Sequence, residues 1–363
     1  MGEGGQVHGN DHQLTWVLRI TTMNKKIAVL GTGSNGSCVA ADLANAGLDV
    51  ALIDQWPAHV EAMREKGLHI TLRQGEIHAT VRACHLCDLA SMRQTFDVVL
   101  LMTKAYDTRW HAELIKPYLA KDGFLVGVQN GMTAETIAEV VGPSRTLGCV
   151  AELSSYCFTP GEIKRNTAPE RTWFGLGSFH PSTKGREQEV AAVLKSAGKV
   201  DFVENILAAK FMKMVVNTMT LGTMAMVGGD LADKQPEGMS DLMMRLGTES
   251  LAVGKALGHP VVPLFGLGPE DIEGPRRRLL QVFIDKLNRD IGPGRGPNTT
   301  LQDHIKGRLS EVDVMNGLIV EESEKRGMTA PANAAIVEVT RRIYAGQLKP
   351  DAANLQLAIE LAG

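Results

Sequence analysis

Short apolar runs of strand length alternate with amphipathic helical segments along the first half of the chain. Lys26–Leu30 (KIAVL) is apolar and ends at a glycine, which is typical of a buried parallel strand. Val39, Leu43 and Ala46 share one stripe of a predicted helix over Gly36–Ala46. The alternation continues, with further strands predicted at Asp49–Ile53, Asp97–Thr103, Gly123–Val128, Thr146–Leu153 and Lys199–Val203. Leu68–Leu72 and Ile77–Ala83 predict a hairpin. Further helices are predicted at Ala58–Lys66, Thr108–Leu119 and Gly185–Ser196, and another begins at Thr133. Strands that alternate with helices predict an α/β fold, a Rossmann-type doubly wound parallel sheet with helices on both faces.

A different pattern begins after Glu204, where helical periodicity continues without strands. Ile206–Val227 predicts one long helix rich in methionine, and we interpret its methionines as core residues. Further helices are predicted at Ser240–Leu257, Asp271–Asp290, Leu309–Arg326, Ala332–Tyr344 and Ala352–Leu361. We therefore predict a Rossmann domain over residues 23–204 and an all-helical domain over residues 205–363. The polar, glycine-rich residues 1–22 are expected to be a disordered extension.

Composition and charge exclude several function classes. A net charge of −3 provides no basic field for nucleic acid or an anionic membrane, and no apolar run approaches the roughly 20 residues of a membrane span. The five cysteines follow no disulfide framework, which suits a reducing cytoplasm. Cys84 and Cys87 have the spacing of a zinc knuckle, but no second pair follows, so we predict no metal site. We expect a cytoplasmic protein without nucleic-acid or membrane partners.

A glycine-rich loop joins the first predicted strand to the first predicted helix. Gly31, Gly33 and Gly36 form the G-x-G-x-x-G pattern, with Ser34 and Asn35 between the last two glycines. In a dinucleotide-binding fold the first glycine permits a tight turn, the second lets the backbone approach a pyrophosphate, and the third allows close packing of helix on strand. The helix N-terminus then offers N–H groups to the phosphates. The strand–loop–helix context therefore predicts a dinucleotide site built on these five residues.

Asp54 ends the second predicted strand, where the adenosine ribose of a dinucleotide would lie. A carboxylate there accepts hydrogen bonds from the ribose hydroxyls and repels a 2′-phosphate. Residues 55–63 contain no lysine or arginine to bind such a phosphate, so we favour NAD over NADP. Capping of the helix that begins near Ala58 is an alternative role for Asp54.

Lys213 and Asn217 are four residues apart in the long methionine-rich helix, so they share one face. Reduction of a ketone by hydride transfer leaves a developing alkoxide, and a lysine supplies both a proton and a positive charge. The surrounding sequence is apolar, and a buried lysine needs a carboxylate partner, for which Glu311 is our candidate. A solvated Lys–Asn pair is the alternative interpretation.

Several sequence blocks together resemble the ketopantoate reductase (2-dehydropantoate 2-reductase) family. They are GTGSNG at Gly31–Gly36, TKAYD at Thr103–Asp107, QNGM at Gln129–Met132, KMVVN at Lys213–Asn217 and TTLQDHIKGRLSEVDVMNG at Thr299–Gly317. The resemblance extends over nearly the whole chain from Met23. It implies an enzyme that transfers a hydride between a nicotinamide dinucleotide and a small carboxylic acid, namely ketopantoate, pantoate or a related 2-oxo or 2-hydroxy acid. A homodimer is a further expectation, for which the sequence carries no specific signal.

The resemblance also implies roles for four residues of the helical half. Lys213 would be the general acid, Asn217 a ligand of the substrate oxygen, and Glu311 the partner of Lys213. Thr299 stands where the family generally has a serine that holds the substrate carboxylate. The methyl group that this threonine adds changes the shape of the predicted pocket.

Lys104 and Asn130 each follow the carboxyl end of a predicted strand, the edge at which ligands bind in such sheets. The resemblance implies that both flank the nicotinamide half of the cofactor and that Asn130 also contacts substrate. The alternatives are a solvated Lys104 and an Asn130 that only shapes the turn before Gly131.

Two other functions stay open. An NAD-dependent dehydrogenase of a different hydroxy acid, similar to the β-hydroxyacid dehydrogenases, also uses a lysine and an asparagine four residues apart. A non-catalytic NAD-binding sensor needs the glycine loop and Asp54, but it has no use for Lys213, Asn217 and Glu311 together.

Overall fold

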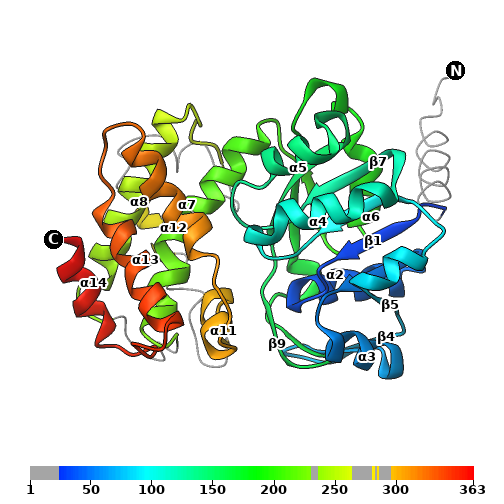
Figure 1. Ribbon diagram of the computed structural model, residues 1–363, viewed down its shortest axis with the longest axis horizontal. Helices are drawn as coiled ribbons and strands as arrows, with labels where there is room; N and C mark the ends of the chain where they lie inside the picture. The colour runs from blue at the N-terminus through cyan, green and yellow to red at the C-terminus, as the bar shows by residue number, and fades with distance from the viewer. Residues whose placement is uncertain (1–23, 230–235, 264–279, 283, 286–295) are drawn as a thin grey trace, which may run out of the picture.

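The computed structural model of the protein describes residues 24–229, 236–263, 280–282, 284–285 and 296–363. Within this part of the chain, a sheet covered by helices lies beside a bundle of helices (Figure 1). The extension predicted over residues 1–22 lies outside the described residues, as does most of the helix predicted at Asp271–Asp290.

An eight-stranded sheet forms the centre of the first part, with the strand order β12-β11-β8-β7-β6-β1-β2-β5. Its strands are β1 (Ile27–Leu30), β2 (Val50–Asp54), β5 (Arg82–His85), β6 (Phe96–Leu101), β7 (Leu119–Gly127), β8 (Thr146–Glu152), β11 (Trp173–Ser178) and β12 (Lys199–Phe202). Neighbouring strands are parallel except β8 and β11. The chain order reverses at β1, which pairs with β2 on one side and β6 on the other. Ligands of doubly wound sheets bind outside the strands' carboxyl ends at such a reversal.

Helices cover both faces of this sheet, as the sequence predicted. They are α2 (Ser34–Asn45), α3 (Pro57–Lys66), α4 (Thr108–Ile115), α5 (Ala134–Val141) and α6 (Glu187–Leu194). Every residue of β1 is buried. Because side chains alternate along a strand, Ile27 and Val29 pack with α2 and α6, whereas Ala28 and Leu30 pack with α4 and α5. The prediction of a Rossmann-type doubly wound fold is confirmed.

A second, four-stranded sheet packs against α2, with the order β4-β3-β10-β9. Its strands are β3 (Leu68–Thr71), β4 (Glu76–Ala79), β9 (Ser155–Thr159) and β10 (Glu162–Arg165). The predicted hairpin is present, since β3 and β4 pair antiparallel. The single strand predicted at Ile77–Ala83 is wrong, because β4 ends at Ala79 and β5 joins the large sheet. The strands β9, β10 and β11 were not predicted from the sequence.

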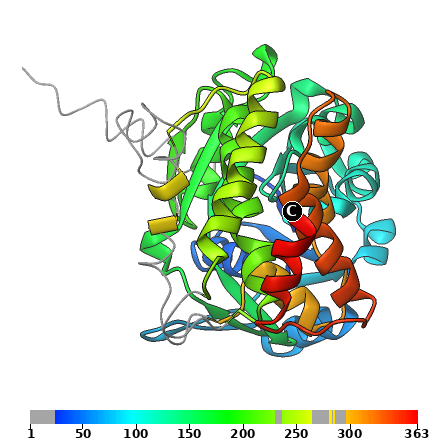
Figure 2. The ribbon, with the colours of Figure 1, turned by 90° about the vertical axis from the view of Figure 1, so that its left-hand side faces the viewer.

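The second part is helical, and the chain enters it at Asn205, whose side chain caps the first helix. The helices are α7 (Ile206–Met226), α8 (Met239–Ala256), α11 (Thr299–Ile305), α12 (Val312–Glu324), α13 (Pro331–Tyr344) and α14 (Asn354–Ala362). Helix α7 packs against the other five and against β8 of the sheet, so it links the two parts, and Figure 2 shows the helices in front of the sheet. Met212, Met214, Met219 and Met226 of α7 are buried in the core, as predicted. None of the described helices is both long enough and apolar enough to cross a membrane.

Candidate functional site

A cavity of about 900 Å³ lies at the carboxyl ends of the strands, between the sheet and the helical part. All the site residues predicted from the sequence line it. They are Gly31, Gly33, Ser34, Asn35, Gly36, Asp54, Lys104 and Asn130 from the sheet part and Lys213, Asn217, Thr299 and Glu311 from the helical part. Residues that are nearly 300 positions apart in sequence therefore line one cavity.

The three glycines of the loop fulfil three different geometric needs. Gly31 has a φ of +93°, and a Cβ there would lie 2.6 Å from the backbone N of Thr103. A Cβ on Gly36 would lie 2.1 Å from the carbonyl O of Gly31. At Gly33 a Cβ would meet nothing within 4 Å, so the space above this residue is open to a ligand.

The N-terminus of α2 carries no competing negative group. Gly33 occupies its N-cap position without a side-chain hydrogen bond, and the first turn has no acidic residue. Asn35 ties this turn to the end of β8, because its amide N donates to the carbonyl of Leu153 over 3.3 Å. The backbone N–H groups and the partial positive charge of the helix end therefore face the cavity, as an anion-binding turn requires.

Asp54 lies at the end of β2 with its carboxylate held in place and only 7% exposed. The backbone N–H of Trp56 donates to its Oδ1 over 2.8 Å, and the Thr32 hydroxyl donates to its Oδ2 over 3.3 Å. The fixed carboxylate borders the cavity, in the position that the sequence predicted for a ribose ligand.

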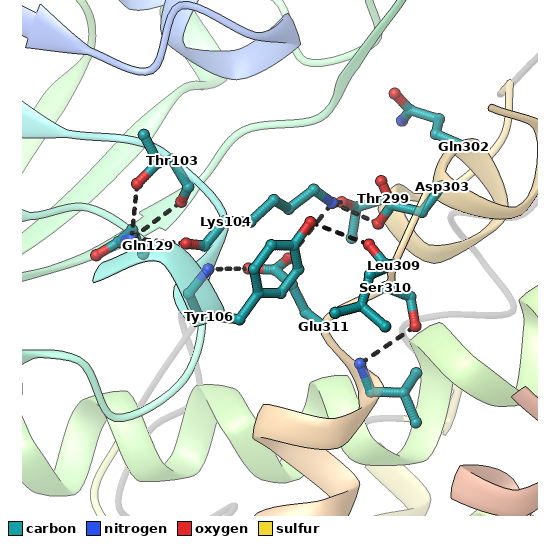
Figure 3. A network of polar contacts seen from close by, with 12 residues as sticks. Thr103, Lys104, Tyr106, Gln129, Thr299, Gln302, Asp303, Leu309, Ser310 and Glu311 are labelled. Carbon is teal, nitrogen blue, oxygen red and sulfur yellow. Dashed lines mark hydrogen bonds and ion pairs between the residues drawn. The ribbon is translucent and has the colours of Figure 1, made fainter. Parts of the chain in front are cut away.

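A buried charge cluster joins the two parts around Lys104, which lies just after β6 (Figure 3). Its Nζ donates to Asp303 Oδ2 over 2.5 Å and to the Thr299 hydroxyl oxygen over 2.9 Å. Glu311 Oε2 lies 3.7 Å from the same Nζ, and Glu311 Oε1 accepts from the backbone N–H of Ala105 over 2.9 Å. One ammonium group thus faces two carboxylates that have little contact with solvent.

The charges of this cluster shift its pKa values. Burial alone would lower the pKa of Lys104, but the carboxylates of Glu311 and Asp303 outweigh it and raise that pKa. Burial raises the pKa of Asp303 to about 6, although the Lys104 charge acts against the rise. Lys104 is therefore held as a cation and is a poor proton donor.

The ion pair observed at Glu311 differs from the expected one. We predicted Lys213 as the partner of Glu311, whereas the ion pair that the structure shows is made with Lys104. The segment that precedes α12 brings Glu311 against the end of β6, where the long Lys104 side chain reaches it. Sequence spacing gives no information on this approach between two domains.

Helix α7 presents Lys213 and Asn217 to the cavity. Lys213 is half-buried, and Asn217 is 4% exposed. The amide N of Asn217 has no hydrogen-bond partner among the described residues. A buried amide that lacks a protein partner is costly unless a ligand satisfies it. Asn217 is therefore suited to donate to an oxygen of a bound molecule.

Two residues that support the site were missed by the sequence analysis. Lys210, one turn before Lys213, is buried, and its Nζ donates to the carbonyls of Gln129 over 2.9 Å and Cys149 over 3.4 Å. Burial lowers the pKa of Lys210 to about 8. The Gln129 side chain in turn donates to the carbonyl of Thr103 over 3.0 Å. Together they fix the turn that carries Asn130. The sequence signal that could have identified Lys210 is its i, i+3 spacing from Lys213.

The cysteines and one histidine cluster lie outside this chemistry. All five cysteines are free thiols, and Cys84 is buried in β5 whereas Cys87 is exposed. On the β3–β4 hairpin, His69, Glu76 and His78 bring ligand atoms within 4.8 Å of one another. This group was not identified from the sequence, and its members do not border the cavity.

Comparisons with known proteins agree with this architecture. The family model "Ketopantoate reductase PanE/ApbA" matches residues 27–178, and "Ketopantoate reductase PanE/ApbA C terminal" matches residues 205–344. The 2-dehydropantoate 2-reductase of Pyrococcus abyssi is 29% identical over 322 residues, which cover 85% of this chain and 94% of the relative. The corresponding protein of Pyrococcus horikoshii is 27% identical over 320 residues, with coverage of 85% and 94%.

Solved structures show the same fold. A PanE/ApbA family ketopantoate reductase from Ralstonia eutropha JMP134 aligns with a TM-score of 0.72 and 25% identity, over 89% of this chain and 99% of the other. A D-mandelate dehydrogenase bound to NADH and anilino(oxo)acetate aligns with a TM-score of 0.76 and 21% identity, over 88% and 99%. The family models together match more than half of the chain. This protein therefore belongs to the ketopantoate reductase family.

Proposed function

We propose that the protein transfers a hydride between a nicotinamide dinucleotide and a small 2-oxo or 2-hydroxy acid. One observation carries the proposal: a single cavity holds both a dinucleotide-type glycine loop and the half-buried Lys213 of the opposite domain. The unpartnered amide of Asn217 borders the same space. A cofactor site and a proton source that meet across two domains are what carbonyl reduction requires.

The residues present fit a nicotinamide dinucleotide. The open space at Gly33 and the uncapped N-terminus of α2 suit its pyrophosphate, and Asp54 suits its adenosine ribose. When bound, the dinucleotide supplies or accepts the hydride. Asp54 favours NAD over NADP, because its carboxylate would repel a 2′-phosphate. Lys104 and Asn130 line the cavity at the ends of β6 and β7, where the nicotinamide half would lie.

Lys213 is the proposed general acid. The raised pKa of Lys104 makes that residue unsuitable for the role, although it also lines the cavity. As the substrate carbonyl is reduced, Lys213 donates a proton to its oxygen, and in the oxidation direction a neutral Lys213 takes the proton back. Asn217 donates a hydrogen bond to the same oxygen or to the carboxylate.

Thr299 and Glu311 hold the substrate end of the site. The Thr299 hydroxyl oxygen accepts a hydrogen bond from Lys104, so its proton is directed elsewhere and is available to a substrate carboxylate. Glu311 fixes Lys104 and the backbone of Ala105, which makes it a positioning residue in this proposal.

The substrate is ketopantoate or a related 2-oxo acid. Leu221, Met224 and Leu301 give the cavity an apolar wall. The second candidate substrate is therefore a 2-oxo acid with an apolar side chain. The similarity to a D-mandelate dehydrogenase that was solved with NADH supports inclusion of such acids. A cytoplasmic setting stays an expectation. A homodimer stays an expectation.

A spectrophotometric panel tests the proposal. NADH and NADPH are each combined with ketopantoate, 2-oxoisovalerate, 2-oxoisocaproate and benzoylformate, and the oxidation of the dinucleotide is followed. We expect turnover of at least one acid, with a higher kcat/KM for NADH than for NADPH. Binding of NADH without turnover of any acid would favour the non-catalytic sensor.

A further inference from the structure

Two cations of the helical domain approach the adenosine end of the cavity. Lys306 directly follows α11, and Arg308 lies two residues further along. The Lys306 Nζ lies 6.0 Å from the ring centroid of Trp56 and 5.2 Å from that of Phe158. The Arg308 guanidinium carbon lies 5.5 Å from the Trp56 ring centroid. All four side chains border the cavity, and Trp56 is two residues after Asp54.

Neither cation has a counter-ion in the described part of the chain. No ion pair or side-chain hydrogen bond joins Lys306 or Arg308 to any of those residues, although Asp303 lies near enough to influence Lys306. Lys306 is half-buried over two aromatic rings, and burial lowers its pKa. Two positive groups without acidic partners on the wall of a ligand cavity favour an anionic ligand.

This placement supplies the charge that the segment after β2 lacks. Residues 55–63 contain neither lysine nor arginine, and Asp54 adds a negative charge there. The cations that face this corner come instead from the segment after α11, across the domain boundary. The pyrophosphate and the 2′-phosphate of a dinucleotide are the anions that can reach this end of a Rossmann cavity.

We propose that Lys306 and Arg308 bind a phosphate group of the dinucleotide and so hold the helical domain against the Rossmann domain. The inference rests on the proposed function, since it requires that a dinucleotide occupies the cavity. Arg308 binds the phosphate through its planar N–H groups, and Lys306 adds a point charge above the Trp56 ring. The pyrophosphate is common to NADH and NADPH, whereas the 2′-phosphate belongs to NADPH alone.

Dinucleotide binding to the full chain tests the inference without substrate. Dissociation constants for NADH and NADPH are measured by isothermal titration calorimetry on wild type, Lys306→Gln, Arg308→Gln and the double variant. Lys349→Gln is the matched control, because Lys349 is an exposed lysine of the same domain and lies outside the cavity. We expect the double variant to weaken binding at least about tenfold and to reduce the salt dependence of the dissociation constant.

The pattern of losses identifies the phosphate. Equal losses for NADH and NADPH assign the pair to the pyrophosphate, and a loss confined to NADPH assigns it to the 2′-phosphate. Arg308 is exposed, so Arg308→Gln tests the idea even if changes at Lys306 disturb the fold. Wild-type affinity of all three variants for both dinucleotides would overturn the inference alone. Failure of wild type to bind either dinucleotide would overturn the proposed function as well.

Discussion

Asp303 imposes a pH dependence on stability that a single substitution removes. Asp303 is 3% exposed, its carboxyl group lies beside Lys104, and burial raises the pKa of that group from 3.8 to about 6. A carboxyl group whose pKa is higher in the folded state binds a proton more readily there than in the unfolded chain. The stability associated with the protonated form is fully present below the unfolded pKa and is lost as the pH rises through the folded pKa.

The size of the effect follows from the shift. A rise of about two pKa units corresponds to roughly 3 kcal/mol, since one unit is about 1.4 kcal/mol. Integrated with the same two pKa values, about 2 kcal/mol of this loss falls between about pH 4.5 and about pH 7.5. Asp303→Asn has no charge to bury. Relative to wild type, the variant should therefore gain about 2 kcal/mol in free energy of unfolding across this interval.

Urea unfolding of the two proteins at both pH values, followed by circular dichroism, measures the effect. Asp122→Asn serves as the control because Asp122 is an exposed aspartate. A difference between Asp303→Asn and wild type that changes by less than about 0.5 kcal/mol over this interval would refute the reasoning.

Three further predictions concern the glycine loop, the Asn217 amide and a buried ion pair. Gly36→Ala should lower the free energy of unfolding by about 1–3 kcal/mol, because its Cβ would meet the carbonyl O of Gly31. Gly33→Ala should keep wild-type stability but weaken NADH binding at least about tenfold. Urea unfolding and calorimetry measure the two effects, and a stability loss in Gly33→Ala with a binding loss in Gly36→Ala would contradict the geometry. Asn217→Ala removes no hydrogen bond from its amide N to the protein, so it should not lower the free energy of unfolding of the ligand-free protein by that route, but it should reduce kcat/KM about 100-fold in the dinucleotide assay. An unchanged kcat/KM would remove Asn217 from the site. Asp42→Ala leaves the buried Arg165 side chain without its counter-ion, since Arg165 Nη1 lies 2.8 Å from the Asp42 carboxylate. The substitution should lower the free energy of unfolding, measured in urea, by about 3 kcal/mol or more. A loss under about 1 kcal/mol would contradict this prediction.

The glycine loop was predictable because its requirements are local. Gly31 needs a positive φ, and Gly36 needs the absence of a Cβ next to the Gly31 carbonyl, so the two positions are visible in the sequence itself. The apolar run of β1 and the Met-rich stripe of α7 likewise carry their own periodicity. These features suffice for the fold class and for the domain in which each site residue lies.

Other features depend on which elements meet in space. The alternation over Ile77–Ala83 is compatible with one strand or two, because a pattern of period two does not say which sheet a residue joins. Three of the four residues of β10 (EIKR) are charged, and this strand pairs only in the small sheet, so its sequence carries a weak strand signal. The ion pair of Glu311 with Lys104 was not predicted for the same reason: the distance from Lys104 to Glu311 is set by how the two domains pack. The approach of Lys306 and Arg308 to Trp56 also depends on that packing.

The proposed mechanism depends on an amine from the helical domain, Lys213, that protonates the substrate oxygen. Lys213→Met keeps the length of the apolar stem and removes the ammonium group. Stopped-flow turnover with NADH and the best acid of the panel, together with calorimetric NADH binding, tests it most directly. We predict a fall in kcat of at least about 100-fold with an NADH dissociation constant within about twofold of wild type. A variant that keeps wild-type kcat would contradict the mechanism.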